Sequence, residues 1–363
     1  MMVQNTVLIT GADTAAGRVF AQALEYEKSV HLITLPDAAT GIGAPTHSGT
    51  RLSPLASHGS DAMKGMSDLL SRHEVKFIIP AGEVWPGVLV GPVQVASAPA
   101  AAAPVVPALK ARVVAPVPAA AEGDNGDPTY LCFTDRQGGL VYCGLVERSP
   151  CGTRLSHVSA TTKVRDAAAA LAGQRELRGA WAMSMAGDRS GESRLVAVTP
   201  AALAAHRLFG ANLTLLALFD MQEKPVSVLP AMLSQARFLD DKPFILGAWK
   251  TVYLDLDDTL IVHGKVHSWG IRFLENARKH QIKVRLITRH YQQPERTLAD
   301  FAIPPSYFDQ IIWLENGEPK SSVMTTEETA IFIDDSFKER QEVMRERNLP
   351  AFAPDLLPAL MRR

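Results

Sequence analysis

The stretch Val252-Tyr-Leu-Asp-Leu-Asp-Asp-Thr-Leu260 decides the fold of the last third of the chain. It is an apolar run that ends in acidic residues, which is typical of a buried strand with functional groups at its carboxyl end. Two further apolar runs have the same form, at residues 284–288 and 330–334, and helices are predicted at 271–280, 294–301 and 336–347. Strands that alternate with helices predict a parallel α/β sheet.

Polar residues follow each of these predicted strands. They are Asp255, Asp257, Thr288, Asp334 and Asp335, and Lys320 lies between the second and third strands. Because the carboxyl ends of parallel strands meet at one edge, the four carboxylates should converge, which is costly without a cation. Carboxylate oxygens are ligands that suit Mg²⁺. A carboxylate can also attack a phosphoryl group, whose oxygens a metal and a lysine would neutralise.

Asp255-Leu-Asp-Asp-Thr-Leu260, Thr288, Lys320 and Ile333-Asp-Asp335 resemble the four motifs of the haloacid dehalogenase (HAD) superfamily, over roughly residues 248–360. The resemblance implies a Rossmann-like phosphotransferase domain with a parallel sheet and little or no cap, since the segments 261–268 and 288–320 are short. It implies that Asp255 is the catalytic nucleophile and Asp257 the catalytic acid and base.

The same resemblance implies that Thr288 and Lys320 hold the phosphoryl oxygens. The Mg²⁺ ion would lie between Asp255, the backbone carbonyl of Asp257, and Asp334, with Asp335 in or near its coordination shell. The residues His263, His267, Arg289 and His290 lie beside the motifs, so they either contact substrate or are solvated loop residues. Asp258 is expected to form a turn.

The N-terminal residues Thr6-Val-Leu-Ile-Thr10 predict a buried strand before the turn Gly11–Gly17. The glycine spacing does not fit a dinucleotide-binding loop, and no acidic residue closes the next strand, so we do not expect NAD(P) binding. Residues 96–128 are rich in Ala and Pro, which favours a linker. A hairpin is predicted at residues 130–144, and strands and helices in the following stretch predict an α+β unit.

Residues 5–220 resemble the ATP-grasp superfamily in its carbamoyl-phosphate-synthetase-like branch, through the hairpin at 130–148, the strand at 180–184 and Gly210-Ala-Asn-Leu213. The family's metal-binding Glu-x-Asn is replaced by Ala197-Val-Thr199. The resemblance therefore implies a degenerate ATP-grasp-like module. We expect three units, with residues 1–96 forming an α/β domain, 97–240 the ATP-grasp-like α+β domain and 241–363 the HAD-like domain.

The composition excludes several classes of protein. A formal net charge of −1 gives no electrostatic case for nucleic acid or an anionic membrane, and prolines interrupt the most apolar stretch. The three cysteines fit buried thiols better than a disulfide framework or a zinc site. No signal peptide is evident. We expect a cytoplasmic protein with no nucleic-acid or membrane partner, and a homo-oligomer is left open.

These patterns predict a Mg²⁺-dependent phosphatase that acts on a phosphorylated small molecule through an aspartyl-phosphate on Asp255. The N-terminal region would then give specificity or assembly. Two alternatives stay open. One is a ligand-binding or scaffold protein with a regulatory HAD domain, and the other is an atypical ATP-grasp ligase.

Overall fold

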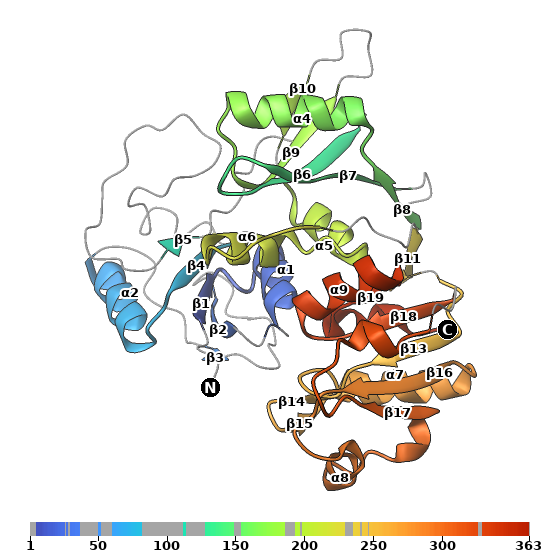
Figure 1. Cartoon of the computed structure of the whole chain (residues 1–363). Helices are drawn as coiled ribbons and strands as arrows, with labels where there is room; N and C mark the ends of the chain where they lie inside the picture. The colour runs from blue at the N-terminus through green and yellow to red at the C-terminus, as the bar shows by residue number, and fades with distance from the viewer. Residues whose placement is uncertain are drawn as a thin grey trace.

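The computed structural model describes most of the chain. The described residues are 5–25, 27, 30–36, 50–51, 60–81, 112–113, 128–148, 154–185, 193–196, 198–228, 235–239, 242–245, 247–325 and 329–362. Cys151 and nearly all of the expected linker at 96–128 lie outside them. Three main sheets follow one another along the chain, two of them parallel and one antiparallel, so the fold is a mixed α/β fold (Figure 1).

The first sheet is parallel and has the order β3-β2-β1-β4-β5. Its elements are β1 (Asn5–Thr10), α1 (Ala15–Leu24), β2 (Val30–Leu35), β3 (Thr50–Arg51), α2 (Ser60–Arg72), β4 (Phe77–Pro80) and β5 (Arg112–Val113). The fully buried side chains of Val7 and Ile9 face α1 and also α6 (Leu213–Met221). A helix from much later in the sequence therefore completes the core of this sheet.

The second sheet is antiparallel throughout and has the order β10-β9-β6-β7-β8-β11-β12. Its elements are β6 (Thr129–Thr134), β7 (Leu140–Arg148), β8 (Arg154–Ser159), α4 (Thr162–Gln174), β9 (Gly179–Met185), β10 (Ser193–Val196), α5 (Pro200–Leu208), β11 (Gln235–Leu239) and β12 (Lys242–Ile245). The strand β12 belongs to this sheet, so the sheet extends past residue 240.

The alternation of side chains along β6 and β7 gives this sheet two apolar faces. One face, with Cys132 and Cys143, packs under α4, and both cysteines are buried free thiols. The other face, with Phe133 and Tyr142, packs against α5 and α6. The helix α6 therefore contributes to the cores of both the first and the second sheet.

The third sheet is parallel and has the order β17-β16-β13-β18-β19. Its elements are β13 (Thr251–Leu254), α7 (Ser268–Lys279), β16 (Lys283–Thr288), α8 (Pro294–Asp300), β17 (Gln310–Trp313), β18 (Ala330–Ile333), α9 (Phe337–Arg347), β19 (Ala351–Phe352) and α10 (Leu357–Leu360). A small hairpin of β14 (Ile261–Val262) and β15 (Lys265–Val266) follows β13.

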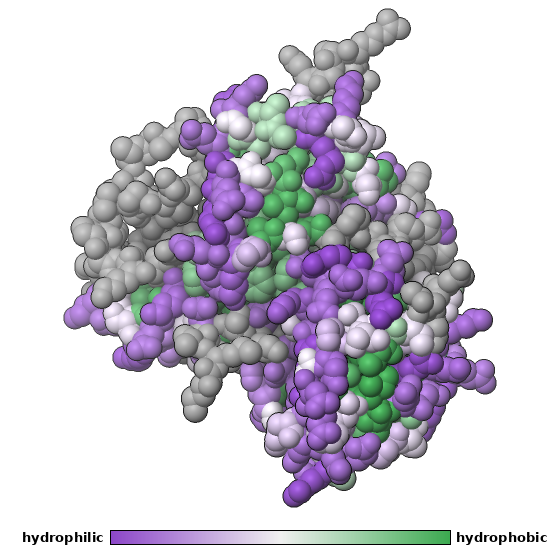
Figure 2. All heavy atoms as spheres, viewed as in Figure 1, coloured by the Kyte–Doolittle hydropathy of each residue, from purple (hydrophilic) through white to green (hydrophobic). Residues whose placement is uncertain are grey.

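The strand β13 lies at the centre of this sheet. Val252 and Leu254 pack with α7, α8 and α10, while Tyr253 packs with α9 on the opposite face. The core on the α7 face also contains Leu208 and Phe209 at the end of α5. The second and third sheets therefore share one apolar core. In Figure 2, hydrophilic residues cover much of the coloured part of one face, with smaller apolar areas between them.

Within the described residues, no single helix is long and apolar enough to cross a membrane, and only α5 and α6, bent by 96°, pass that test as a pair. Both helices carry residues buried inside the protein.

Candidate metal centre

The carboxyl end of the third sheet brings together three buried carboxylates. Asp255 follows β13 and is 3% exposed, while Asp334 and Asp335 follow the neighbouring strand β18 and are 0% and 5% exposed. One oxygen of each lies within 4.8 Å of the others. The parallel pairing of β13 and β18 therefore places these residues together, as the sequence analysis expected of them.

Lys320 lies among these carboxylates, although it is distant from both strands in sequence. Its Nζ donates to Asp255 Oδ1 at 2.5 Å and to Asp334 Oδ2 at 2.6 Å, and the residue is 5% exposed. Burial alone would lower the pKa of Lys320, but the charges of Asp255 and Asp334 and these hydrogen bonds raise it above its ordinary value. The lysine is therefore held as a cation.

The electrostatics of the cluster favour a further cation. Burial raises the pKa of Asp255, an effect that Lys320 opposes and that Asp334 and Asp335 reinforce. Three carboxylates and one ammonium leave a formal charge of −2 in a water-poor site. All the anionic ligand atoms are oxygens, which suit a hard divalent cation. The donor set therefore fits Mg²⁺.

The loops that carry the carboxylates are fixed by neighbours that the sequence analysis did not single out. Thr259 Oγ1 donates to Asp255 Oδ2 at 3.4 Å and accepts from the Asp335 backbone N–H at 3.1 Å. The buried Arg340 donates through one Nη atom to the carbonyl oxygens of Asp334, at 2.6 Å, and Asp335, at 2.8 Å. Arg340 lies six residues after Asp334, on the helix that follows it. A basic residue at this distance after the acidic pair is the sequence signal that could have indicated this contact.

Asp257 is half-exposed and contacts Thr288, which is fully buried. The Asp257 side chain is 49% exposed, and its Oδ2 accepts from Thr288 Oγ1 at 3.4 Å. Asp258 has a φ of 55°, and its N–H donates to the Ile261 carbonyl, so it forms the turn into the β14–β15 hairpin. Thr288 thus faces the same edge of the sheet as the three buried carboxylates.

The four residues that were candidates for substrate contact lie in different surroundings. Arg289 forms a two-point ion pair with Glu339 of α9, at 2.7 and 3.1 Å. His290 is buried and contacts Asp257, His267 is buried with its Nδ1 3.0 Å from the Thr259 carbonyl, and His263 is exposed at the tip of the β14–β15 hairpin. Arg289, His267 and His290 are therefore held by this chain's own groups.

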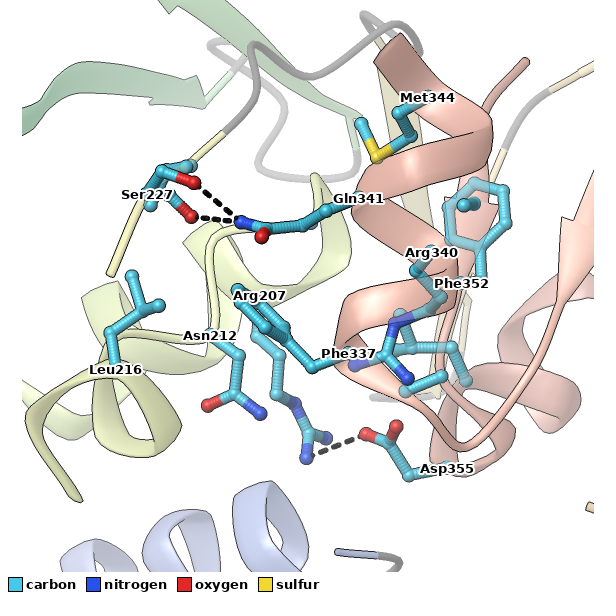
Figure 3. Close-up of a pocket in the computed structure, with 15 residues that line it drawn as sticks. Arg207, Asn212, Leu216, Ser227, Phe337, Arg340, Gln341, Met344, Phe352 and Asp355 are labelled. Carbon is cyan, nitrogen blue, oxygen red and sulfur yellow. Dashed lines mark hydrogen bonds and ion pairs between the residues drawn. The ribbon is translucent and has the colours of Figure 1, made fainter. Parts of the chain in front are cut away.

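The helix α9, which carries Arg340, lies next to residues of α5 and α6 (Figure 3). Its Gln341 donates to the Ser227 carbonyl at 2.5 Å and to Ser227 Oγ at 2.8 Å. Phe337 stacks edge-on against Phe219 of α6, with ring centroids 5.4 Å apart. Nearby, Arg207 of α5 and Asp355 form a 2.8 Å ion pair. The helix that holds the carbonyls of Asp334 and Asp335 is therefore packed on α6.

Comparison with solved structures gives matches among ATP-dependent carboxylases and ligases. The match to a biotin carboxylase from Campylobacter jejuni, solved as a β-γ-ATP complex, covers 65% of this chain and 75% of the carboxylase chain, with a TM-score of 0.42 and 8% identity. The ATPase subunit of phosphoribosylaminoimidazole carboxylase from Aquifex aeolicus covers 64% and 81%, with a TM-score of 0.39 and 10% identity. An L-amino acid ligase from Bacillus licheniformis covers 65% and 79%, with a TM-score of 0.39 and 11% identity.

No protein-family model and no curated protein sequence matches the chain. The structural matches are ATP-grasp enzymes, as expected for the ATP-grasp-like region. At this identity the likeness concerns the fold, and with TM-scores below 0.5 no residue role is carried over from these proteins.

The comparisons contradict the predicted phosphatase. The matching structures are carboxylases and ligases rather than phosphate-ester hydrolases, and none of these comparisons supports the HAD assignment. They agree better with the alternative of an ATP-grasp ligase. The phosphatase prediction was wrong because it inferred a reaction class from residues at strand ends. Carboxylates at the ends of parallel strands indicate a possible cation site, but they do not determine which reaction a bound ligand undergoes.

Proposed function

We propose that the third sheet carries a Mg²⁺ site that binds the phosphoryl group of a small-molecule ligand. One observation carries the proposal. A single buried lysine bridges two of three clustered carboxylates, so a site for a divalent cation and a donor for phosphoryl oxygens adjoin each other. We further propose that the chain has three units, as predicted at residues 1–96, 97–240 and 241–363, except that β12 extends the second unit to Ile245. The metal site lies in the last unit.

The chain's own residues have distinct tasks in this proposal. Asp255, Asp334 and Asp335 would hold the cation, which when bound would offset the charge of phosphoryl oxygens. Lys320, now hydrogen-bonded to two carboxylates, would donate to a phosphoryl oxygen, and Thr288 would donate beside it. Burial of the cluster strengthens each of these interactions because little water competes for the charges.

The test is calorimetric titration of Mg²⁺ into the full chain, beside Asp335→Asn and the control Asp300→Asn. Asp335 belongs to the cluster, whereas Asp300 is exposed at the end of α8. We expect wild type and Asp300→Asn to bind equally, and Asp335→Asn to bind at least about tenfold more weakly, which is 1.4 kcal/mol. Equal Mg²⁺ binding by all three proteins would show that the cation does not bind at the cluster.

A second candidate is ATP-dependent ligation by the N-terminal two-thirds of the chain. It is favoured by the order of a parallel sheet followed by an antiparallel sheet with the β6–β7 hairpin, as the sequence resemblance to ATP-grasp proteins implies. The residue that replaces the family's metal-binding Asn, Thr199, instead caps α5 through its hydroxyl.

Titration of Mg-ATP into wild type and Asp335→Asn separates the two candidates. A nucleotide held at the carboxylate cluster should bind the variant more weakly. A nucleotide held at the antiparallel sheet should bind both proteins alike. Absence of ATP binding by the wild-type chain would rule out the ligase.

A further inference from the structure

His290 joins Asp257 to the interior of the third unit. The histidine is 8% exposed, and its Nδ1 lies 2.8 Å from Asp257 Oδ1 and 2.9 Å from Oδ2. Its Nε2 lies 2.8 Å from Thr297 Oγ1 on α8, and Thr297 Oγ1 also accepts from Gln292 Nε2 at 2.8 Å. Four side chains thus form one hydrogen-bonded chain that ends on Asp257.

The chemistry of the partners fixes the direction of these hydrogen bonds. An ionised carboxylate only accepts, so the proton must lie on Nδ1 of His290. The Thr297 residue is 3% exposed, and its hydroxyl accepts from Gln292 Nε2 and lies within hydrogen-bond distance of Nε2 of His290. The geometry therefore assigns a proton to Nδ1 of His290, directed at Asp257.

The backbone of His290 is held just as firmly as its ring. Its N–H donates to Thr288 Oγ1 at 3.1 Å, and its carbonyl accepts from Trp313 Nε1 of the neighbouring strand β17 at 2.9 Å. The ring is thus placed by the end of β16 and by α8 behind it. Asp257, in contrast, is half-exposed and would otherwise sample several rotamers.

We infer that His290 is a positioning residue, which donates from Nδ1 to fix the Asp257 carboxylate and its loop beside the carboxylate cluster. The inference rests on the proposed function, because Asp257 lies two residues after Asp255 on the loop that would border the cation. Hydrogen-bonded partners behind a metal site orient the groups around the ion, and their removal commonly weakens metal binding about 10- to 100-fold. His290 acts through Asp257 and would not contact the ligand itself.

The first test reads the tautomer directly and needs no ligand. Long-range ¹H–¹⁵N NMR spectra of the histidine rings distinguish a proton on Nδ1 from one on Nε2, and the signals of His290 are assigned by their loss in His290→Leu. We expect a proton on Nδ1 in wild type. In Asp257→Ala, which lacks the carboxylate acceptor, we expect the preference for Nδ1 to be lost. Absence of a proton from Nδ1 of wild-type His290 would overturn the inference, whether or not the chain binds a metal.

The second test compares His290→Leu with His290→Asn in calorimetric Mg²⁺ titrations. The Asn side chain places an N–H near the position of Nδ1, while Leu fills similar space without a donor. We expect Leu to weaken Mg²⁺ binding about tenfold and Asn to stay within about twofold of wild type. Equal weakening by Asn and Leu would indicate packing alone and contradict the positioning role. If wild type bound no Mg²⁺, the proposed function would fail. The NMR measurement of the His290 ring proton would still test the hydrogen bond to Asp257.

Discussion

Lys320 bridges Asp255 and Asp334 through its ammonium group. Replacing it with Met keeps most of its volume but leaves three buried carboxylates without their ammonium partner. Breaking a buried ion pair by removing one member typically costs about 3 to 5 kcal/mol. We expect Lys320→Met to lose free energy of unfolding on that scale in urea titrations without Mg²⁺.

Mg²⁺ should return part of this stability to Lys320→Met, because a ligand at about 100 times its dissociation constant adds about 2.7 kcal/mol. Lys320→Arg, which keeps the positive charge, serves as the control and should depend less on the metal. A Lys320→Met protein that unfolds at the same urea concentration with and without Mg²⁺ would contradict the cation site.

At the residue scale, the sequence predicted that four carboxylates would converge, and Asp255, Asp334 and Asp335 do so because they follow neighbouring parallel strands. Asp257 was expected among them, but its side chain is 49% exposed and pairs with His290 instead. It also predicted that Lys320 would join them. It did not predict that His290 lies behind Asp257, nor that Arg289 pairs with Glu339. Those partners depend on side-chain directions and on helix placement, which a strand-end pattern does not contain.

At the scale of elements, the turn before α1 depends on Gly17. A Cβ at this position would lie only 2.6 Å from the Ala12 Cα atom, so backbone would have to shift. We expect Gly17→Ala to lower the free energy of unfolding by about 1 to 3 kcal/mol. Gly173 in α4 has nothing within 4 Å of such a Cβ, so Gly173→Ala should instead stabilise by about 0.5 to 1 kcal/mol. Chemical unfolding measures the free energy of unfolding of both variants. If Gly173→Ala lost as much of it as Gly17→Ala, the close approach at Gly17 would not be the cause.

The packing of α5 on the antiparallel sheet includes a buried polar network. Tyr142 Oη lies 2.7 Å from His206 Nδ1 and 3.1 Å from His157 Nε2. Burial, together with the charge of nearby His157, lowers the pKa of His206 to about 3. The unfolded chain, with a histidine pKa of about 6.5, therefore binds more protons than the folded chain between these two values. Stability from His206 is present above pH 6.5 and is lost as the pH falls toward 3.

We expect wild type to lose up to about 1.4 kcal/mol of unfolding free energy per pH unit below pH 6.5 through this group. His206→Asn, which can still accept from Tyr142, should lack that part of the loss. Urea unfolding at several pH values from 7.5 to 4.5 measures the difference. Parallel curves for the two proteins would show that His206 does not stay neutral in the fold.

The sequence predicted the main strands and helices of the third sheet because their apolar periodicity is strong. It missed β8, whose burial pattern does not alternate regularly, and α6, whose residues are apolar on nearly every side. A helix without a polar face gives no amphipathic signal, and α6 is buried because it packs with two sheets.

At the scale of the whole molecule, the second and third sheets should unfold together. Leu155 and Phe209 lie in the same buried cluster as Val252 and Phe273, so neither sheet can expose this core alone. We expect amides of β7 and β13 to show the same opening free energy in native-state hydrogen exchange. Phe209→Ala should lower both by about 3 to 5 kcal/mol.

Leu195→Ala is the matched control, since Leu195 is 38% exposed on the edge strand β10 and should change stability by less than about 0.5 kcal/mol. Different opening energies for β7 and β13, or an effect of Phe209→Ala on only one of them, would show that the sheets unfold independently. The sequence could not predict this shared core, because it joins residues more than 40 positions apart through apolar side chains that carry no distinctive motif.

The central claim is that a divalent cation binds at Asp255, Asp334 and Asp335. The most direct measurement is anomalous X-ray diffraction from crystals of the full chain soaked in Mn²⁺, which takes the same oxygen ligands as Mg²⁺. We predict a manganese peak bonded to oxygens of these three carboxylates in wild type, and its loss in Asp335→Asn. Crystals with manganese bound elsewhere, or with Lys320 still on both carboxylates and no peak among them, would contradict the account.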